Sequence, residues 1–234
     1  MLIAVGGAHD AQIDRLIDRL GPDRAARMAV KDLSSPGWRL GSDRPGEGVV
    51  VAGGRAIPVS QVTGVLVRRL AVYPHELTDV HEADRAYAAA ELTALLMWWL
   101  TVLPAPVMNR PAKGVLCGPF GRPEPWLALG AELGLAVVSE TRTRDLRPAP
   151  PAPRWTISVV GDTVIGAAPR NLGALAVRLA QGAGASVLRA AFDAAGRLMA
   201  ADSFPPLDEP VIDAIAARVW SSPVTAPPVL SAAS

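Results

Sequence analysis

The first 70 residues switch between two hydrophobic periods, and the switching predicts an α/β layer. Residues 10–21 repeat their apolar side chains at i, i+3, i+4 and i+7, which marks one face of a helix. Residues 49–59 form two short apolar runs around Gly53 and Gly54, a pair typical of a hairpin turn. Apolar runs typical of buried strands occupy 2–5, 28–30 and 64–70. This order of elements favours an open α/β sheet.

One long helix dominates the next 70 residues. Residues 79–103 contain no Gly or Pro and are rich in helix-forming residues, with Asp79 and Glu82 placed as a capping box. Pro104 is expected to end this helix. Beyond it the pattern predicts a short strand, a Pro- and Gly-rich loop, a helix and a strand, at 106–109, 110–124, 125–133 and 135–141.

A Pro- and Arg-rich segment, residues 142–154, is typical of a linker. Beyond it, hairpins turning at Gly161 and near Asp193–Gly196 alternate with predicted helices at 171–181 and 209–220. Asp208 is placed to cap the last helix. We therefore predict an α/β domain at 1–141, a linker at 142–154, a smaller α+β subdomain at 155–220 and a disordered tail at 221–234.

Composition and charge narrow the functional class. The chain has 234 residues, 50% of them hydrophobic, and its 23 basic and 22 acidic residues leave a net charge of +1. This balance gives no global preference for nucleic acid or for an anionic membrane. Cys117 is the only cysteine, which excludes an intramolecular disulfide and a cysteine-built zinc site. The first ten residues lack a basic region, and the longest apolar stretch is too short to span a bilayer. We expect a soluble cytoplasmic protein.

Arg68 and Arg69 are the leading candidate ligand residues because they lie at the end of the predicted strand at 64–70. Ligands of open α/β sheets bind at the carboxyl ends of the strands. Two guanidinium groups at that edge are suited to hold a carboxylate or a phosphate. The alternative is that both arginines are either exposed to solvent or ion-paired within the protein.

Three other features have structural explanations that compete with functional ones. His75 and His81 are too far apart in sequence to share one helix face, as a metal-binding pair would. Trp98 and Trp99 point about 100° apart on a helix, so one belongs to the core and the other is available for a junction or a partner. Cys117 is distant in sequence from every histidine that a nucleophilic thiol would need as its base.

The order of motifs across residues 64–141 matches a known pattern. The strand GVLVRRL is followed by a long helix, the short strand PVMNRP, a loop and the segment WLALGAELGLAVVSET. This order resembles the N-terminal half of ATP-grasp proteins, most closely the ligases that modify peptides and ribosomal proteins. The matching positions are Asn109, Pro111, Ala131, Leu133, Gly134, Leu135 and Thr141.

The C-terminal part resembles the last subdomain of the same superfamily. SVVGDTVIGAA is similar to its Val-Gly-Asp hairpin, and VLRAAFDAAGRLMAADSF is similar to the paired strands that end in a metal-binding Glu-x-Asn motif. That motif falls here near Ala201, Asp202 and Ser203. The resemblance implies an N-terminal α/β domain of the pre-ATP-grasp type and a small α+β ATP-grasp-like subdomain.

The chain departs from the family pattern where the nucleotide phosphates would bind. Arg122 and Pro123 stand where the family has a lysine, and no lysine follows Lys113. The family's central nucleotide-binding subdomain would have to fit into residues 142–154, which are too few. Phosphoryl transfer depends on such charges, so their loss is expected to remove several kcal/mol of transition-state stabilisation.

Three hypotheses follow. The favoured one is a contracted ATP-grasp-like protein without nucleotide chemistry, needing no cofactor, that binds a peptide, a small acid or a partner protein through Arg68, Arg69, Asn109 and Arg122. The alternative is an ATP-dependent carboxylate–amine ligase, with Mg²⁺ held by Asp193 and Asp202. The last is an accessory subunit of a homo- or hetero-oligomer that completes its site with a partner chain. Convergence of Asp193, Asp202, Arg68 and Arg122 on one cleft would favour the ligase.

Overall fold

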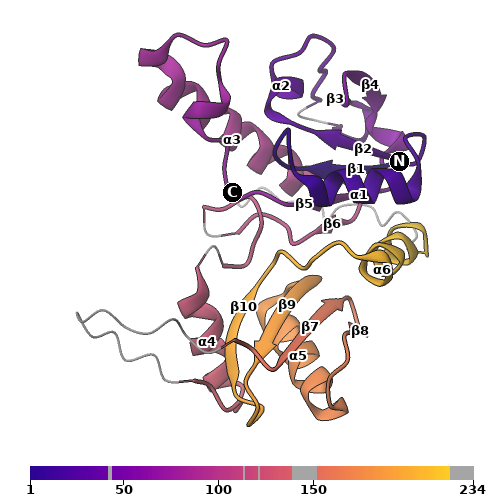
Figure 1. The fold of residues 1–234 in the computed structure, drawn as a ribbon. Helices are drawn as coiled ribbons and strands as arrows, with labels where there is room; N and C mark the ends of the chain where they lie inside the picture. The colour runs from indigo at the N-terminus through magenta and orange to yellow at the C-terminus, as the bar shows by residue number, and fades with distance from the viewer. Residues whose placement is uncertain (42–43, 113, 121, 139–151, 222–234) are drawn as a thin grey trace, which may run out of the picture.

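The computed structural model describes residues 1–41, 44–112, 114–120, 122–138 and 152–221. They form two four-stranded sheets, one above the other in Figure 1. The first sheet is parallel, with strand order β2-β1-β5-β6. Its strands are β1 (Leu2–Val5), β2 (Ala25–Met28), β5 (Gly64–Val67) and β6 (Val107–Met108).

Both faces of the first sheet are covered, which explains its continuous apolar strands. One face packs against α2 (Val30–Leu33), the hairpin of β3 (Val49–Ala52) and β4 (Arg55–Pro58), and the inner side of α3 (Arg85–Val102). The other face packs against α1 (Ala11–Leu20) and α6 (Glu209–Ser221). Short 3-10 turns lie at Pro45–Glu47, Val59–Gln61, Pro74–Glu76 and Glu82–Asp84.

The second sheet is antiparallel, with strand order β10-β9-β7-β8. Its strands are β7 (Trp155–Val160), β8 (Thr163–Ile165), β9 (Val187–Phe192) and β10 (Leu198–Asp202). Helices α4 (Pro123–Glu132) and α5 (Arg170–Ala183) contribute the other side of its core. The mixed α/β class predicted from the sequence is confirmed, with parallel and antiparallel strands in separate sheets.

Helix α6 joins the two halves. Its apolar side packs in one cluster with Leu2 and Leu66 of the first sheet and with Val160 and Val187 of the second. Arg19 of α1 also pairs with Asp213 of α6, with 3.0 Å between Nη2 and Oδ2. The last helix of the predicted C-terminal subdomain therefore belongs equally to the N-terminal core. The domain boundaries at 141 and 155 stay predictions.

Several local predictions differ from the structure. The second strand is Ala25–Met28, not 28–30. Arg27 hides this strand in the hydrophobic pattern, and the edge position of β2 accommodates its side chain. Helix α3 begins at Arg85, so Asp79 is not its cap. Arg85 instead donates to the carbonyl of Val80 at 2.9 Å, which holds the preceding segment in a turn.

The other differences concern the region around the linker. Of the strand expected at 135–141, residues 135–138 contain one parallel bridge between Val137 and Leu198, and 139–141 lie outside the described residues. The predicted linker lies outside the described residues except for 152–154, and the predicted tail lies outside them except for Ser221. Within the described residues, no helix is both long enough and apolar enough to span a bilayer.

Candidate functional site at the junction of the two sheets

The strand order of the first sheet reverses direction at its centre, and this places a reversal point at its carboxyl edge. The chain moves from β1 outward to β2, then returns to β5 and moves the opposite way to β6. Such a reversal separates the loops that follow the two central strands, and ligands bind there. Gly6 follows β1 and leads to Asp10, the cap of α1, while Arg68 follows β5. The predicted arginine thus lies at the reversal point.

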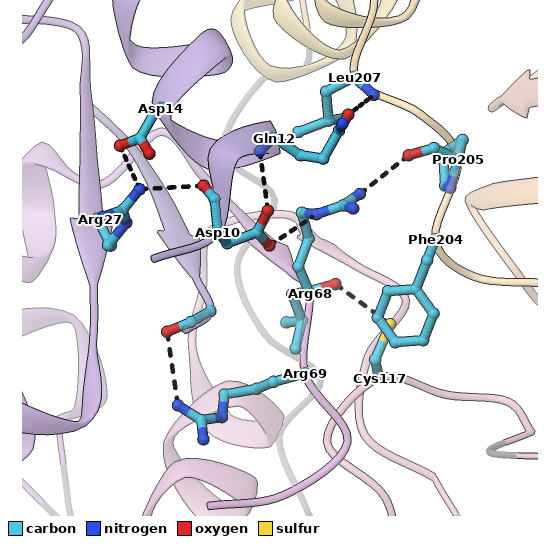
Figure 2. A network of polar contacts seen from close by, with 12 residues as sticks. Asp10, Gln12, Asp14, Arg27, Arg68, Arg69, Cys117, Phe204, Pro205 and Leu207 are labelled. Atoms are coloured by element: carbon cyan, nitrogen blue, oxygen red, sulfur yellow. Dashed lines mark hydrogen bonds and ion pairs between the residues drawn. The ribbon is translucent and has the colours of Figure 1, made fainter. Parts of the chain in front are cut away.

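Arg68 lies at this edge of the sheet and joins three segments of the chain (Figure 2). Its Nε donates to Oδ2 of Asp10 at 3.3 Å, and its Nη1 donates to the carbonyl of Pro205 at 2.9 Å. The side chain is 9% exposed and its guanidinium faces the ring of Phe204. Asp10 also accepts from the backbone N–H of Gln12 at 2.9 Å. One carboxylate therefore caps α1 and orients Arg68.

Residues 203–208, here called the strap, run over the same edge between β10 and α6. The backbone N–H of Leu207 donates to Oε1 of Gln12 at 2.6 Å, as Figure 2 shows. At the other end of the strap, Oγ of buried Ser203 donates to the carbonyl of Gly118 at 2.9 Å. The strap therefore fixes the loop after β6 and the start of α1 to the second sheet.

The side chain of Arg69 points away from the contacts of Arg68 and toward residues 71–76. Its Nε donates to the carbonyl of Ala71 at 2.9 Å, its Nη1 reaches the carbonyl of Gly6 at 3.5 Å, and its Nη2 pairs with Glu76. The residue is 6% exposed. The alternative considered for both arginines, an internal ion pair, is the arrangement found, since Arg69 pairs with Glu76 and Arg68 pairs with Asp10. A ligand-binding role for Arg69 stays a prediction that the burial disfavours.

Asn109 connects the two sheets. Its Nδ2 donates to the carbonyl of Val187 at 2.6 Å, and its Oδ1 accepts from the backbone N–H groups of Ser186 at 2.9 Å and Val187 at 3.0 Å. The backbone has φ 57°, and Asn is one of the few residues that adopt this left-handed conformation readily. These contacts occupy the amide inside the protein, so binding of a ligand through Asn109 stays a prediction.

Cys117 is the centre around which the predicted residues gather. Its Sγ donates to the carbonyl of Val67 at 3.2 Å. Burial raises the pKa of the thiol to about 12, while Asn109, Ser203 and Arg68 act in the opposite direction and Asp202 adds to the rise. Three predicted site residues, Arg68, Asn109 and Asp202, therefore lie around one buried thiol. A thiol with so high a pKa is unsuited to act as a nucleophile at neutral pH.

The two carboxylates predicted to hold Mg²⁺ lie at opposite ends of one hairpin. Asp202 ends β10, whereas Asp193 forms the turn and pairs with Arg197. The five residues from Arg197 to Asp202 span about 16 Å of strand. Two ligands of one ion must each lie within about 2–2.6 Å of it. The structure therefore contradicts the pairing of Asp193 with Asp202 in one metal site.

Each of these carboxylates is also occupied by protein groups. Oδ2 of Asp202 accepts from Nε of Arg189 at 2.9 Å and from its Nη2, and Oδ1 accepts from the backbone N–H of Phe204 at 2.7 Å. Asp193 accepts from two backbone N–H groups in its turn, and the hydrogen bond from Arg197 is the main cause of its lowered pKa. No cluster of three or more His, Cys, Asp or Glu occurs within the described residues. The residues present do not fit the family's magnesium site.

Among the described residues, Arg122 takes part in no hydrogen bond or ion pair with this junction. Arg122 is exposed and directly precedes α4, the helix that packs against β10 and α5. The structure thus brings together Arg68, Asn109 and Asp202 and leaves Asp193 and Arg122 elsewhere. Sequence reasoning missed Asp10 and gave no internal partner to Ser203. Asp10 carried a signal, because it directly precedes the apolar face of α1 as a cap does.

No family model and no curated protein matches this sequence. Solved structures do match. The macrocyclase MdnC from Microcystis aeruginosa, bound with precursor peptide MdnA, has a TM-score of 0.67 and 13% identity over 95% of this chain and 100% of that one. The ATP-grasp ligase PsnB with a minimal precursor, Mg and ADP has a TM-score of 0.62 and 15% identity over 94% and 98%. The chain has an ATP-grasp-like fold.

A third structure agrees with this assignment. A Chryseobacterium gregarium RiPP-associated ATP-grasp ligase, in complex with ADP and a leader and core peptide, has a TM-score of 0.59 and 10% identity over 95% of this chain and 97% of that one. Identities this low establish the fold alone. They confirm the resemblance drawn from the motifs at 64–141 and 155–209, and the small size of this ATP-grasp-like chain is consistent with a contracted member.

Proposed function

We propose that this protein binds a peptide of a peptide-modification pathway on its ATP-grasp-like fold and carries out no phosphoryl transfer of its own. One observation carries the second half of the proposal. Asp202 lies where the metal-binding motif of the superfamily falls, and here its carboxylate is held by the guanidinium of Arg189. A fixed cation of the protein occupies the place next to this carboxylate that Mg²⁺ would need.

The neighbouring residue supports the same conclusion. Ser203 stands where the motif has an asparagine, and its hydroxyl is buried and donates to Gly118. Asp202 and Ser203, two residues of the segment in which the motif falls, therefore both make contacts that hold the protein together. The lysine-free sequence after Lys113 is consistent with this, because the phosphate-contacting lysine of the central subdomain has no counterpart.

The peptide half of the proposal is supported by the fold and by the contacts of Arg68. MdnC, PsnB and the Chryseobacterium ligase are all described in complex with a precursor or a leader and core peptide. In this chain, Nη2 of Arg68 has no hydrogen-bond partner among the described residues, although Nε and Nη1 are held in place. A guanidinium fixed in this way is suited to a carboxylate side chain of a bound peptide.

The nucleotide half is tested by thermal unfolding with and without millimolar Mg·ATP. We expect no Mg²⁺-dependent rise in Tm. A ligand present at 100 times its Kd would add about 2.7 kcal/mol, which is several degrees for a chain of this size. A rise that Asp202→Asn removes and the exposed control Asp18→Asn keeps would establish the ligase alternative instead.

The peptide half is tested by selecting binders from a displayed library of random 20-residue peptides and measuring their affinity by calorimetry. We expect acidic peptides whose affinity falls about tenfold in Arg68→Gln, since a hydrogen bond to a charged group contributes about 1.5–3 kcal/mol. Arg15→Gln, an exposed change on α1, is the matched control. Equal affinities in both variants, with the fold intact by circular dichroism, would remove Arg68 from the site. The accessory-subunit hypothesis stays a prediction.

A further inference from the structure

A cavity of about 310 Å³ lies beside β6, the last strand of the first sheet. This volume is at the lower end of the range found for small-molecule sites. Val107 forms part of one wall, and Arg218 and Val219 near the end of α6 form part of another. Helix α6 begins next to the strap that holds Arg68 and is about 20 Å long. The cavity is therefore separate from the site around Arg68.

The main chain of Val107 has its polar groups on the outer edge of the sheet. The carbonyl of Pro106 accepts from the N–H of Val65 at 2.8 Å, so it faces β5. In a trans peptide the N–H points opposite to the C=O, so the N–H of Val107 faces away from β5, and its own C=O follows. Neither group has a hydrogen-bond partner among the described residues. Val107 is 8% exposed, and main-chain groups this buried are normally paired.

The next outward N–H of the same strand segment does have a partner. The backbone N–H of Asn109 donates to Oγ of Ser186 at 3.1 Å, and Ser186 also lines the cavity. This contact holds the start of β9 beside the free edge of β6. Two residues earlier, the position opposite Val107 is occupied by the cavity instead. The edge of the sheet is thus paired at Asn109 and open at Val107.

The charges around the cavity favour an anion. Arg110 and Arg218 both line it, and no acidic residue does so within the described part of the chain. Arg110 uses its Nη1 and Nη2 groups on carbonyls at the end of α3, so it contributes charge rather than a donor. Arg218 lies against the turn at Gly161, where an added Cβ would collide with its Nη1. A carboxylate that enters the cavity therefore meets positive charge from two sides of the fold.

We propose that this cavity binds an N-acylated amino acid. Its carboxylate accepts from the N–H of Val107 and from Arg218, and its amide N–H donates to the C=O of Val107, as in an antiparallel strand pair. The apolar parts of the ligand lie against Pro106, Met108 and Val219. The amide is required because a free amino acid carries an ammonium group, which the arginines repel. The same chemical group occurs in a free N-acyl amino acid and at the carboxyl terminus of a peptide.

An NMR titration of the isotope-labelled chain with N-acetylvaline tests the proposal. We expect a Kd of about 1 mM, as suits so small a ligand, and a downfield shift of the Val107 amide proton as it gains a hydrogen bond. The methyl ester of N-acetylvaline lacks the charge, and isovalerate lacks the amide. Each should bind at least about fivefold more weakly. No shift at Val107 up to about 10 mM, or equal binding of the ester, would overturn the proposal.

A matched pair of arginine variants tests the role of Arg218. Arg218→Gln should weaken binding of N-acetylvaline about tenfold, since a hydrogen bond between charged groups is lost. Arg170→Gln, at an exposed arginine of α5 that does not line the cavity, should leave binding unchanged. Equal affinities in the two variants would overturn the assignment. If Arg218→Gln lowers the Tm, the comparison of acid and ester on the wild-type chain still decides.

Two further arms separate this site from the one at Arg68 and identify the source of the ligand. Arg68→Gln should bind N-acetylvaline as the wild type does, so either site can fail without the other. Shifts at Gln12 and Leu207 without a shift at Val107 would place the anion at Arg68 and overturn the proposal. Tighter binding of acetyl-alanyl-alanyl-valine than of N-acetylvaline would assign the cavity to a peptide carboxyl terminus, and weaker binding would assign it to a free small molecule.

Discussion

The junction around Cys117 and the outer side of α3, which carries Tyr87 and Trp98, both depart from the usual distribution of polar and apolar residues. The two departures are opposite in kind. At the junction, polar groups such as Asn109 and Ser203 are buried. On the outer side of α3, apolar groups such as Tyr87 and Trp98 are exposed. Burial of polar groups and exposure of large apolar ones are the two departures from the ordinary pattern that carry information about a protein.

The difference between the two regions lies in whether their contacts are complete. Both heteroatoms of the Asn109 amide have partners inside the protein, so the hydrogen bonds of this amide are complete. The outer side of α3 has no corresponding cover within the described residues. The contacts of the junction therefore stabilise this molecule, whereas the outer side of α3 is exposed to solvent within the described part of the chain.

The largest effect at the junction is expected at Asn109. Asn109→Ala removes four side-chain hydrogen bonds and leaves the backbone N–H groups of Ser186 and Val187 and the carbonyl of Val187 without this partner. We expect the free energy of unfolding to fall by about 3 kcal/mol. Urea unfolding followed by tryptophan fluorescence measures it, with exposed Asn171→Ala as the control, expected within about 0.5 kcal/mol of wild type. A loss below about 1 kcal/mol at Asn109 would mean that the junction is not closed by this amide.

A pH-dependent effect of intermediate size is expected from Cys117. In the unfolded chain the thiol has its ordinary pKa of 9.0, whereas burial raises the pKa to about 12 in the folded protein. Between these values the unfolded chain loses the proton and the folded chain keeps it. The free energy of unfolding should therefore fall by about 1.4 kcal/mol per pH unit above pH 9, with no contribution below it.

The comparison that isolates this effect is between wild type and Cys117→Ser. Serine keeps a hydroxyl donor for the carbonyl of Val67 and does not titrate in this range. Urea midpoints at pH 8, 9 and 10 should diverge between the two proteins only above pH 9 (about the ordinary thiol pKa). Parallel curves would show that solvent reaches the thiol in the folded state.

The smallest effect is expected on the outer side of α3. Tyr87→Ser removes a ring that is 71% exposed, so in dilute solution the free energy of unfolding should change by less than about 0.5 kcal/mol. Trp99→Ala, on the inner side of the same helix, should lose about 4 kcal/mol. Urea unfolding of both variants tests the contrast. A large loss in Tyr87→Ser at low protein concentration would show that this ring stabilises the monomer itself.

Much of the fold could be predicted from the sequence because local sequence patterns indicate its strands and hairpins. The hairpin at Gly53 and Gly54, the turn at Gly161 and the cap at Asp208 all occur where the pattern placed them. Strand β2 was misplaced because Arg27 interrupts its apolar run. The start of α3 was misplaced because the Arg85 side chain donates to backbone carbonyls and holds the preceding segment in a turn. Helix propensity does not take such contacts into account.

The site was predicted in part, for a physical reason of the same kind. The rule that ligands bind at the carboxyl ends of parallel strands located Arg68, since it depends only on strand position. The rule does not distinguish Arg68 from Arg69, although adjacent side chains at a strand end point in opposite directions. The pairing of Asp193 with Asp202 failed because motif order says nothing about distance along a hairpin.

The position of α6 has a consequence for synthesis of the chain on the ribosome. Leu2 and Leu66 of the first sheet are covered on one side by a helix that ends at Ser221. Until that last helix emerges, the newly made N-terminal half exposes an apolar sheet face. Contacts between such distant parts of a chain form slowly, and exposed apolar surface promotes aggregation in the interval. The first sheet therefore has both of its faces covered only after Ser221 has been translated, however early its strands are encoded.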